Sequence, residues 1–272
     1  MGWNAKKLPF PARPCEDRGN ILSSSPMNTE SSAAKFSIGS ILSDAWKVFQ
    51  ERFQDIAVAA LIIAVPLNVI LAFLPKQDPE AGAIDFYVTG AALLVGLIAA
   101  LASTIAVLGT MRIAEKALNG EYITWDTALR YGLSRWFASF WTSLLAGIML
   151  IGLFLLLIVP GVIFAVYWGF AMAVVALRGM EGMSALRYSR SLVKGRWWKT
   201  FGYWLVFGLL NMVCALIVSA VFAVIPEARV STILGNSVVS LVSAFFTVVG
   251  IVFFLRFEAT RIEDGAAPVE AE

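Results

Sequence analysis

The segment that decides the fold runs from residue 159 to residue 199 and reads VPGVIFAVYWGFAMAVVALRGMEGMSALRYSRSLVKGRWWK. It opens with a Pro-Gly pair, continues with an apolar run that ends at Leu177, and closes with a basic stretch rich in Arg and Trp. An uncharged apolar run of this length is typical of a helix that crosses a membrane. The rest of the chain repeats this alternation of apolar run and basic loop, which indicates a multi-pass, all-α membrane protein.

Composition agrees with this class. Of the 272 residues, 59% are hydrophobic and 15% are charged, whereas charged residues make up about a quarter of a typical soluble domain. The net charge of +2 favours no nucleic-acid partner. The chain has no histidine, and its two cysteines, Cys15 and Cys214, stand far apart. We therefore expect no metal site, no disulfide framework and no cofactor.

Six apolar segments are long enough to cross the ~30 Å hydrocarbon core of a bilayer as helices. They cover about 56–74, 87–111, 140–159, 161–177, 200–225 and 231–255. The sequence thus predicts a six-helix transmembrane bundle with cytoplasmic amphipathic helices over residues 37–260. The first of these helices is expected near 40–53, with one apolar face made of Ile41, Leu42, Ala45, Val48 and Phe49. The proline-broken polar segment 1–36 is predicted to be disordered, and 261–272 to be a short acidic tail.

The third and fourth spans are divided at Pro160 and Gly161, because proline lacks an N–H and glycine frees the backbone. One long helix over 140–177 is the alternative, and the distribution of charge decides between them. With six spans, 19 of the 21 Lys and Arg residues fall on one side, leaving Lys76 and Arg229 for the other. The positive-inside rule then predicts that both termini are cytoplasmic.

Several motifs of the segment resemble a known bacterial family. They are VPG at 159–161, YW at 167–168, EGMSALRYSR at 181–190 and LVKGRWW at 192–198, together with FSIG at 36–39. This pattern resembles the membrane domain that precedes the catalytic domain in some glycerophosphoryl diester phosphodiesterases, whose stand-alone relatives are mostly uncharacterised. The family pattern often has Glu just after the fourth span, where Arg178 stands here. The resemblance implies a multi-pass protein of the bacterial inner membrane. No barrel-sized segment follows residue 260, so we expect no phosphodiesterase activity.

The basic segment predicts a surface helix that contacts anionic lipid head groups, with an apolar stripe of Leu186, Val193 and Trp197 as its membrane anchor. The alternative is that these charges only set the topology. The candidate lipid-contacting residues are Arg187, Arg190, Lys194, Arg196, Trp197, Trp198 and Lys199.

Two amides, Asn68 and Asn211, are the strongest polar groups within the predicted spans. They form either a substrate-facing pair or hydrogen bonds between helices, and the second interpretation is favoured. Carboxylates at the membrane edge are scattered over different loops, without the spacing of a catalytic or metal site. They are Asp85, Glu115, Asp126, Glu181, Glu227 and Glu258.

These patterns favour a non-catalytic membrane scaffold that works with membrane lipids and with another membrane or peripheral protein in lipid or envelope processes. The main alternative is a permease for a small solute or lipid with a neutral pathway, because no span carries a charged residue. A membrane-embedded enzyme ranks third.

Overall fold

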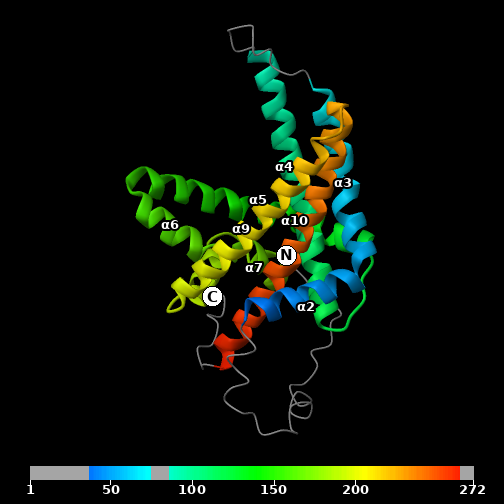
Figure 1. The fold of residues 1–272 in the computed structure, drawn as a ribbon. Helices are drawn as coiled ribbons and strands as arrows, with labels where there is room; N and C mark the ends of the chain where they lie inside the picture. The colour runs from blue at the N-terminus through cyan, green and yellow to red at the C-terminus, as the bar shows by residue number, and fades with distance from the viewer. Residues whose placement is uncertain (1–36, 75–85, 264–272) are drawn as a thin grey trace, which may run out of the picture. The chain divides into compact units, whose positions relative to one another are not determined.

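The computed structural model describes residues 37–74 and 86–263, and all regular secondary structure within these ranges is helical (Figure 1). The described residues from Ile38 to Glu263 belong to one compact unit. The predictions for the tail 1–36, for Asp85 and for most of the acidic segment 261–272 lie outside the described residues.

The described residues form nine helices. Their bounds are α2 (Ile38–Glu51), α3 (Phe53–Phe73), α4 (Phe86–Leu118), α5 (Trp125–Leu156), α6 (Ile158–Tyr167), α7 (Ala171–Arg178), α8 (Gly182–Val193), α9 (Trp197–Phe222) and α10 (Ala228–Glu263).

Six segments within the described ranges are long and apolar enough to cross a membrane, which confirms the predicted fold class. They are Phe53–Phe73, Tyr87–Leu118, Trp125–Leu156, Ile158–Arg178, Trp197–Phe222 and Ala228–Arg261. The second, third and sixth extend well beyond the predicted spans, because each helix continues without a break into charged sequence at one of its ends. The chain is therefore a polytopic helical protein, with six apolar helices that fit a multi-pass membrane protein.

The boundary between the third and fourth spans lies three residues before Pro160. Leu157 has an extended backbone (φ −162°, ψ 136°) and separates α5 from α6. Pro160 then occupies the first turn of α6, where the missing N–H costs little. Gly161 allows α6 to approach α5 closely, since a Cβ atom at this position would lie 2.6 Å from the Phe154 ring.

A second interruption, which the sequence analysis did not predict, divides the fourth span at residues 168–170, between α6 and α7. Trp168 and Phe170 are almost fully buried there. The aromatic ring of Phe170 packs against Phe253, Phe254 and Phe257 of α10, with centroid distances between 5.4 and 5.8 Å. The interruption is thus held inside the protein.

The last helix, α10, is the centre of the packing (Figure 1). It contacts α2, α3, α4, α8 and α9. Its buried side chains include Val248, Val249, Ile251, Val252, Phe253, Phe254 and Phe257. The amphipathic helix α2 contacts α10, α3 and α4. Four of the five residues of its predicted apolar face are buried, namely Ile41, Ala45, Val48 and Phe49, and the fifth, Leu42, is half-buried.

Candidate functional site

Several helices meet around a partly buried ion pair between Arg178, the last residue of α7, and Glu258 of α10. The guanidinium donates two hydrogen bonds to the carboxylate, one of them from Nε to Oε1 at 2.9 Å, and the Tyr188 hydroxyl of α8 donates a third. Only 7% of the Glu258 side chain is exposed, compared with 35% for Arg178. Two parallel N–H···O bonds fix the pair's geometry, and the three bonds compensate for the burial of the carboxylate.

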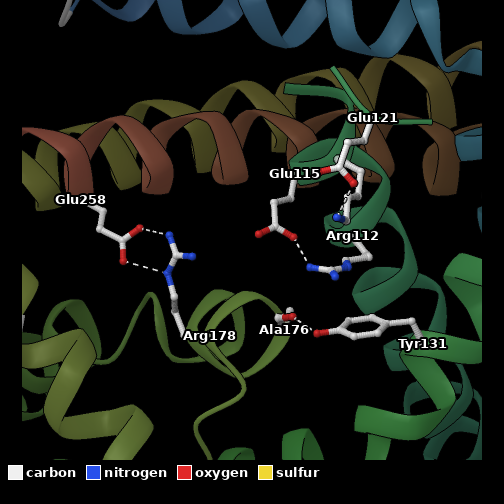
Figure 2. A network of polar contacts seen from close by, with 8 residues as sticks. Arg112, Glu115, Glu121, Tyr131, Ala176, Arg178 and Glu258 are labelled. Carbon is white, nitrogen blue, oxygen red and sulfur yellow. Dashed lines mark hydrogen bonds and ion pairs between the residues drawn. The ribbon is translucent and has the colours of Figure 1, made fainter. Parts of the chain in front are cut away.

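A second pair on α4 continues this network (Figure 2). Arg112 donates to Glu115, and its guanidinium lies 4.7 Å from the centre of the Tyr131 ring of α5. The Tyr131 hydroxyl donates in turn to the carbonyl of Ala176 in α7. Figure 2 shows the Glu115 carboxylate between Arg112 and Arg178, close enough to interact electrostatically with Arg178. We call Arg112, Glu115, Arg178, Tyr188 and Glu258 the ionic network.

The ionic network keeps its tyrosine in the neutral form. Burial raises the pKa of Tyr188 far above its ordinary value, and the hydrogen bond to Glu258 raises it further. Tyr188 therefore donates to Glu258 at every physiological pH. Tyr188 thus helps to position the Glu258 carboxylate, which accepts its other hydrogen bonds from Arg178.

The other carboxylates that the sequence singled out do not join the network. Asp126 accepts a hydrogen bond from Thr124, and Glu181 and Glu227 are exposed. Within residues 37–74 and 86–263 no three His, Cys, Asp or Glu side chains converge as metal ligands. One buried carboxylate was missed: Asp55 of α3 accepts a hydrogen bond from the Trp125 N–H at 3.1 Å and so ties α3 to the start of α5.

The amphipathic helix α8 turns its apolar face toward the protein. Leu186 and Val193 are 1% and 0% exposed, and Leu186 packs in a cluster with Trp168 and Ala171. The expectation that this stripe anchors α8 in the membrane is therefore wrong, because α5, α6 and α7 already cover it. The opposite face carries Arg187, Arg190 and Lys194, all of which are exposed.

The residues after α8 divide into two groups. Arg196 and Trp197 are half-buried: Arg196 donates to Thr260 Oγ1 at 2.7 Å, and Trp197 Nε1 donates to the Ile163 carbonyl at 3.1 Å. Trp198, by contrast, is 78% exposed, and Lys199 is also exposed. The exposed members of the predicted lipid-contacting set, which we call the basic row, are Arg187, Arg190, Lys194, Trp198 and Lys199.

Ser189 of α8 closes the interruption in the fourth span. Its Oγ accepts a hydrogen bond from the Phe170 N–H at 3.2 Å and donates one to the Tyr167 carbonyl at 2.7 Å. The side chain is fully buried. A broken helix among apolar neighbours needs such a partner, since an unsatisfied buried backbone group costs about 1–3 kcal/mol. The sequence did not indicate that Ser189 binds the backbone of Tyr167 and Phe170, because Ser189 resembles any other serine of an amphipathic helix.

A cavity of about 420 Å³ lies beside this interruption, between α7, α9 and α10. We call it the α9–α10 cavity. Its lining is mostly aromatic, aliphatic and glycine, with three polar residues and no ionisable one. The lining residues are Met111, Gly169, Phe170, Met172, Ala173, Trp204, Phe207, Gly208, Asn211, Ser243, Phe246, Thr247, Gly250, Ile251 and Phe253.

The two intramembrane amides lie in different surroundings. Asn68 of α3 is buried and its Nδ2 donates to Ser237 Oγ of α10 at 3.5 Å. Asn211 of α9 lines the α9–α10 cavity, and its Oδ1 is buried without a hydrogen-bond partner among the described residues. Asn68 does not belong to the cavity lining, so the structure does not bring the two amides to one site.

Comparison of the chain with family models, with curated proteins and with solved structures finds no match. The resemblance to the membrane domain of glycerophosphoryl diester phosphodiesterases therefore stays a prediction from the residues quoted above.

Proposed function

We propose that the protein is a non-catalytic multi-pass scaffold of the bacterial inner membrane, with both termini in the cytoplasm and its basic row on anionic lipid head groups. The observation that carries the proposal is the orientation of α8. Its apolar face is buried in the protein, so Arg187, Arg190 and Lys194 face outward as a row. Each such cation near an anionic surface contributes about 1 kcal/mol of attraction.

The neighbouring aromatic residue supports the same assignment. Trp198 stands at the start of α9, where the apolar helix meets the basic loop, and is largely exposed. An indole ring favours this boundary because it has an apolar body and one polar N–H. The row therefore combines cations with a residue suited to the head-group layer.

The ionic network supports the scaffold role, because it joins the end of α7 to α8 and α10 and, through the Glu115 carboxylate near Arg178, to α4. Helices joined in this way present the exposed basic row in one orientation to another membrane or peripheral protein. Purification in mild detergent, with identification of co-purifying proteins, tests this second part of the proposal.

The lipid contact is tested by the triple variant Arg187→Gln, Arg190→Gln, Lys194→Gln. All three side chains are exposed, so the variant weakens packing only at contacts such as that of Arg190 with the Phe164 ring, 5.5 Å to its centre. We therefore expect a folded protein and a several-fold loss of co-purifying anionic phospholipid. The matched control, Arg187→Lys, Arg190→Lys, Lys194→Arg, keeps the charge and should retain the lipid. High salt should reduce lipid retention in the parent protein. Equal retention by both triple variants would mean that these cations only set topology.

The orientation is tested with single cysteines introduced into a variant without Cys15 and Cys214. We expect Asp78→Cys to be labelled from outside the cell and Met183→Cys only from the cytoplasm. Met183 is suitable because 43% of it is exposed, whereas Leu192, farther along α8, is buried. Labelling of both positions from one side would contradict the six-span topology.

One observation favours the permease alternative. The fourth span is discontinuous at residues 168–170, and interrupted helices form the substrate sites of many secondary transporters. Substrate-dependent flux in proteoliposomes would support a permease. Co-purification with a soluble hydrolase without flux would support the scaffold.

A further inference from the structure

The α9–α10 cavity is a preformed space rather than a packing fault between bulky side chains. Two of its lining residues, Gly208 of α9 and Gly250 of α10, face open space: a Cβ atom added at either position would meet no atom within 4 Å. Gly169 lies at the interruption, where a Cβ would come within 3.1 Å of the Trp204 indole. Gly208 and Gly250 thus leave space in the cavity that a side chain would fill. Gly169, by contrast, allows the Trp204 ring to pack closely against the interruption.

The amide of Asn211 is a polar group in the lining of this cavity. Its Oδ1 is the buried side-chain nitrogen or oxygen atom that lacks a hydrogen-bond partner in the part of the chain that the structure describes. An amide offers both an acceptor oxygen and an NH2 donor. Thr247, a lining residue on α10, donates its hydroxyl hydrogen to the Ser243 carbonyl at 2.9 Å. Asn211 therefore supplies the buried acceptor of the lining that no described residue uses.

The lining also restricts the chemistry of an occupant. No ionisable side chain lines the cavity, so a charged ligand would lose its hydration without compensation. Five aromatic rings and two methionines surround the space, and such linings bind apolar groups of varied shape. A volume of about 420 Å³ lies within the range of small-ligand pockets, about 300–1,000 Å³. An intact two-chain phospholipid is too large and too polar for it.

From these observations we propose that the α9–α10 cavity binds a neutral amphiphile, an apolar body with one hydroxyl group, and that Asn211 holds the hydroxyl. A hydroxyl both donates and accepts, so it satisfies the Asn211 amide in either orientation. The ligand reaches the site from the bilayer, where neutral alcohols dissolve. This site is separate from the basic row and does not depend on the proposed scaffold function.

The test uses the full chain in phosphatidylcholine nanodiscs, with a diazirine-bearing decan-1-ol as photolabel and decan-1-ol or decane as competitor. We expect saturable labelling of peptides from α9 and α10. Decan-1-ol should compete at about tenfold lower membrane concentration than decane, because only the alcohol makes the hydrogen bond. Labelling that does not saturate, or equal competition by decane, would overturn the proposal.

Three variants locate the site. Asn211→Leu removes the amide and should weaken competition by decan-1-ol about tenfold, to the level of decane. Gly250→Leu places a side chain in the cavity and should abolish saturable labelling. The control Asn68→Leu removes the amide outside the cavity and should leave labelling unchanged. If Gly250→Leu does not fold, Asn211→Leu and Asn68→Leu decide: equal effects of the two, or no effect of Asn211→Leu, would overturn the proposal.

Discussion

Glu258 and Asn211 are both polar side chains set among apolar helices, and they differ in what surrounds them. Glu258 accepts hydrogen bonds from Arg178 and Tyr188. The Oδ1 atom of Asn211 accepts none from the described residues and borders a cavity. The first group stabilises the fold through its partners, whereas the second has an unused hydrogen-bonding capacity beside an empty space. This comparison indicates that the ionic network has a structural role, whereas the α9–α10 cavity is the region proposed to bind a ligand.

The largest expected effect is the loss of the carboxylate of Glu258, which is buried although its partner Arg178 is partly exposed. Glu258→Ala removes the acceptor of the Arg178 guanidinium and of the Tyr188 hydroxyl, and leaves Arg178 only its longer-range interaction with Glu115. We expect the free energy of unfolding, measured by SDS titration in mixed micelles, to fall by about 3 kcal/mol. The control is Asp44→Ala, which breaks the more exposed pair with Arg256 and should cost less than about 1 kcal/mol. Equal losses of unfolding free energy in the two variants would show that the burial of Glu258 does not make its ion pair more important than that of Asp44.

A smaller effect is expected at the interruption of the fourth span. Ser189→Ala removes the partner of the Phe170 N–H and of the Tyr167 carbonyl, both inside the protein. The expected loss is about 2 kcal/mol in the same unfolding measurement. Ser184→Ala, at the exposed start of α8, serves as the control and should change stability by less than about 0.5 kcal/mol. A loss at Ser184 as large as that at Ser189 would contradict this role.

The two amides should respond to the same substitution with opposite signs. Asn211→Leu removes a buried oxygen that has no partner and should raise the free energy of unfolding by about 1 kcal/mol in the absence of ligand. Asn68→Leu breaks the hydrogen bond to Ser237 and should lower it by about 0.6 kcal/mol. Thermal unfolding in one detergent compares the two directly. Changes of the same sign would remove the contrast between the cavity and the packed helix interface.

The smallest expected effect is a pH dependence of the ionic network. Burial and the Glu258 hydrogen bond raise the pKa of Tyr188 in the folded protein. The unfolded chain ionises this tyrosine near pH 10 while the folded protein keeps it neutral. Its contribution to stability is therefore complete below about pH 10 and is lost progressively as the pH rises further.

The measurement compares the parent protein with Tyr188→Phe. We expect the stability advantage of the parent to be constant between about pH 7 and 9 and to shrink by about 0.5 kcal/mol at about pH 10.2. An advantage that stays constant up to that pH would mean that Tyr188 titrates normally in the folded protein.

The sequence was informative wherever one property of a local segment decides the outcome. Apolar runs of spanning length predicted the six candidate helices, and the period of Ile41, Ala45, Val48 and Phe49 predicted the buried face of α2. Hydropathy and periodicity are local, so they can be read without knowing what packs against a segment. The same reasoning failed for α8, whose apolar stripe has the same pattern whether it faces lipid or protein.

The positions of the interruptions illustrate a second limit. Pro160 and Gly161 correctly indicated a break nearby, but the helix divides at Leu157, because proline is accommodated within the first turn of α6. Nothing in the local sequence predicted the interruption at residues 168–170. The interruption persists because the Ser189 hydroxyl binds its free backbone groups. Ser189 lies 19 residues after Phe170, so this is a tertiary contact.

By itself, the sequence determined the helical class, the number of apolar segments and the concentration of basic residues in particular loops, since these depend only on composition along the chain. The tertiary structure decided which charged residues form ion pairs and which intramembrane amide keeps an oxygen without a hydrogen-bond partner among the described residues. Arg178 and Glu258 are 80 residues apart and become partners only because the fold brings the end of α7 close to α10. Asn68 and Asn211 look equivalent in the sequence. One found a partner on α10 and the other borders a cavity, because hydrogen bonding in a low-dielectric interior depends on which distant groups the fold brings within about 3 Å.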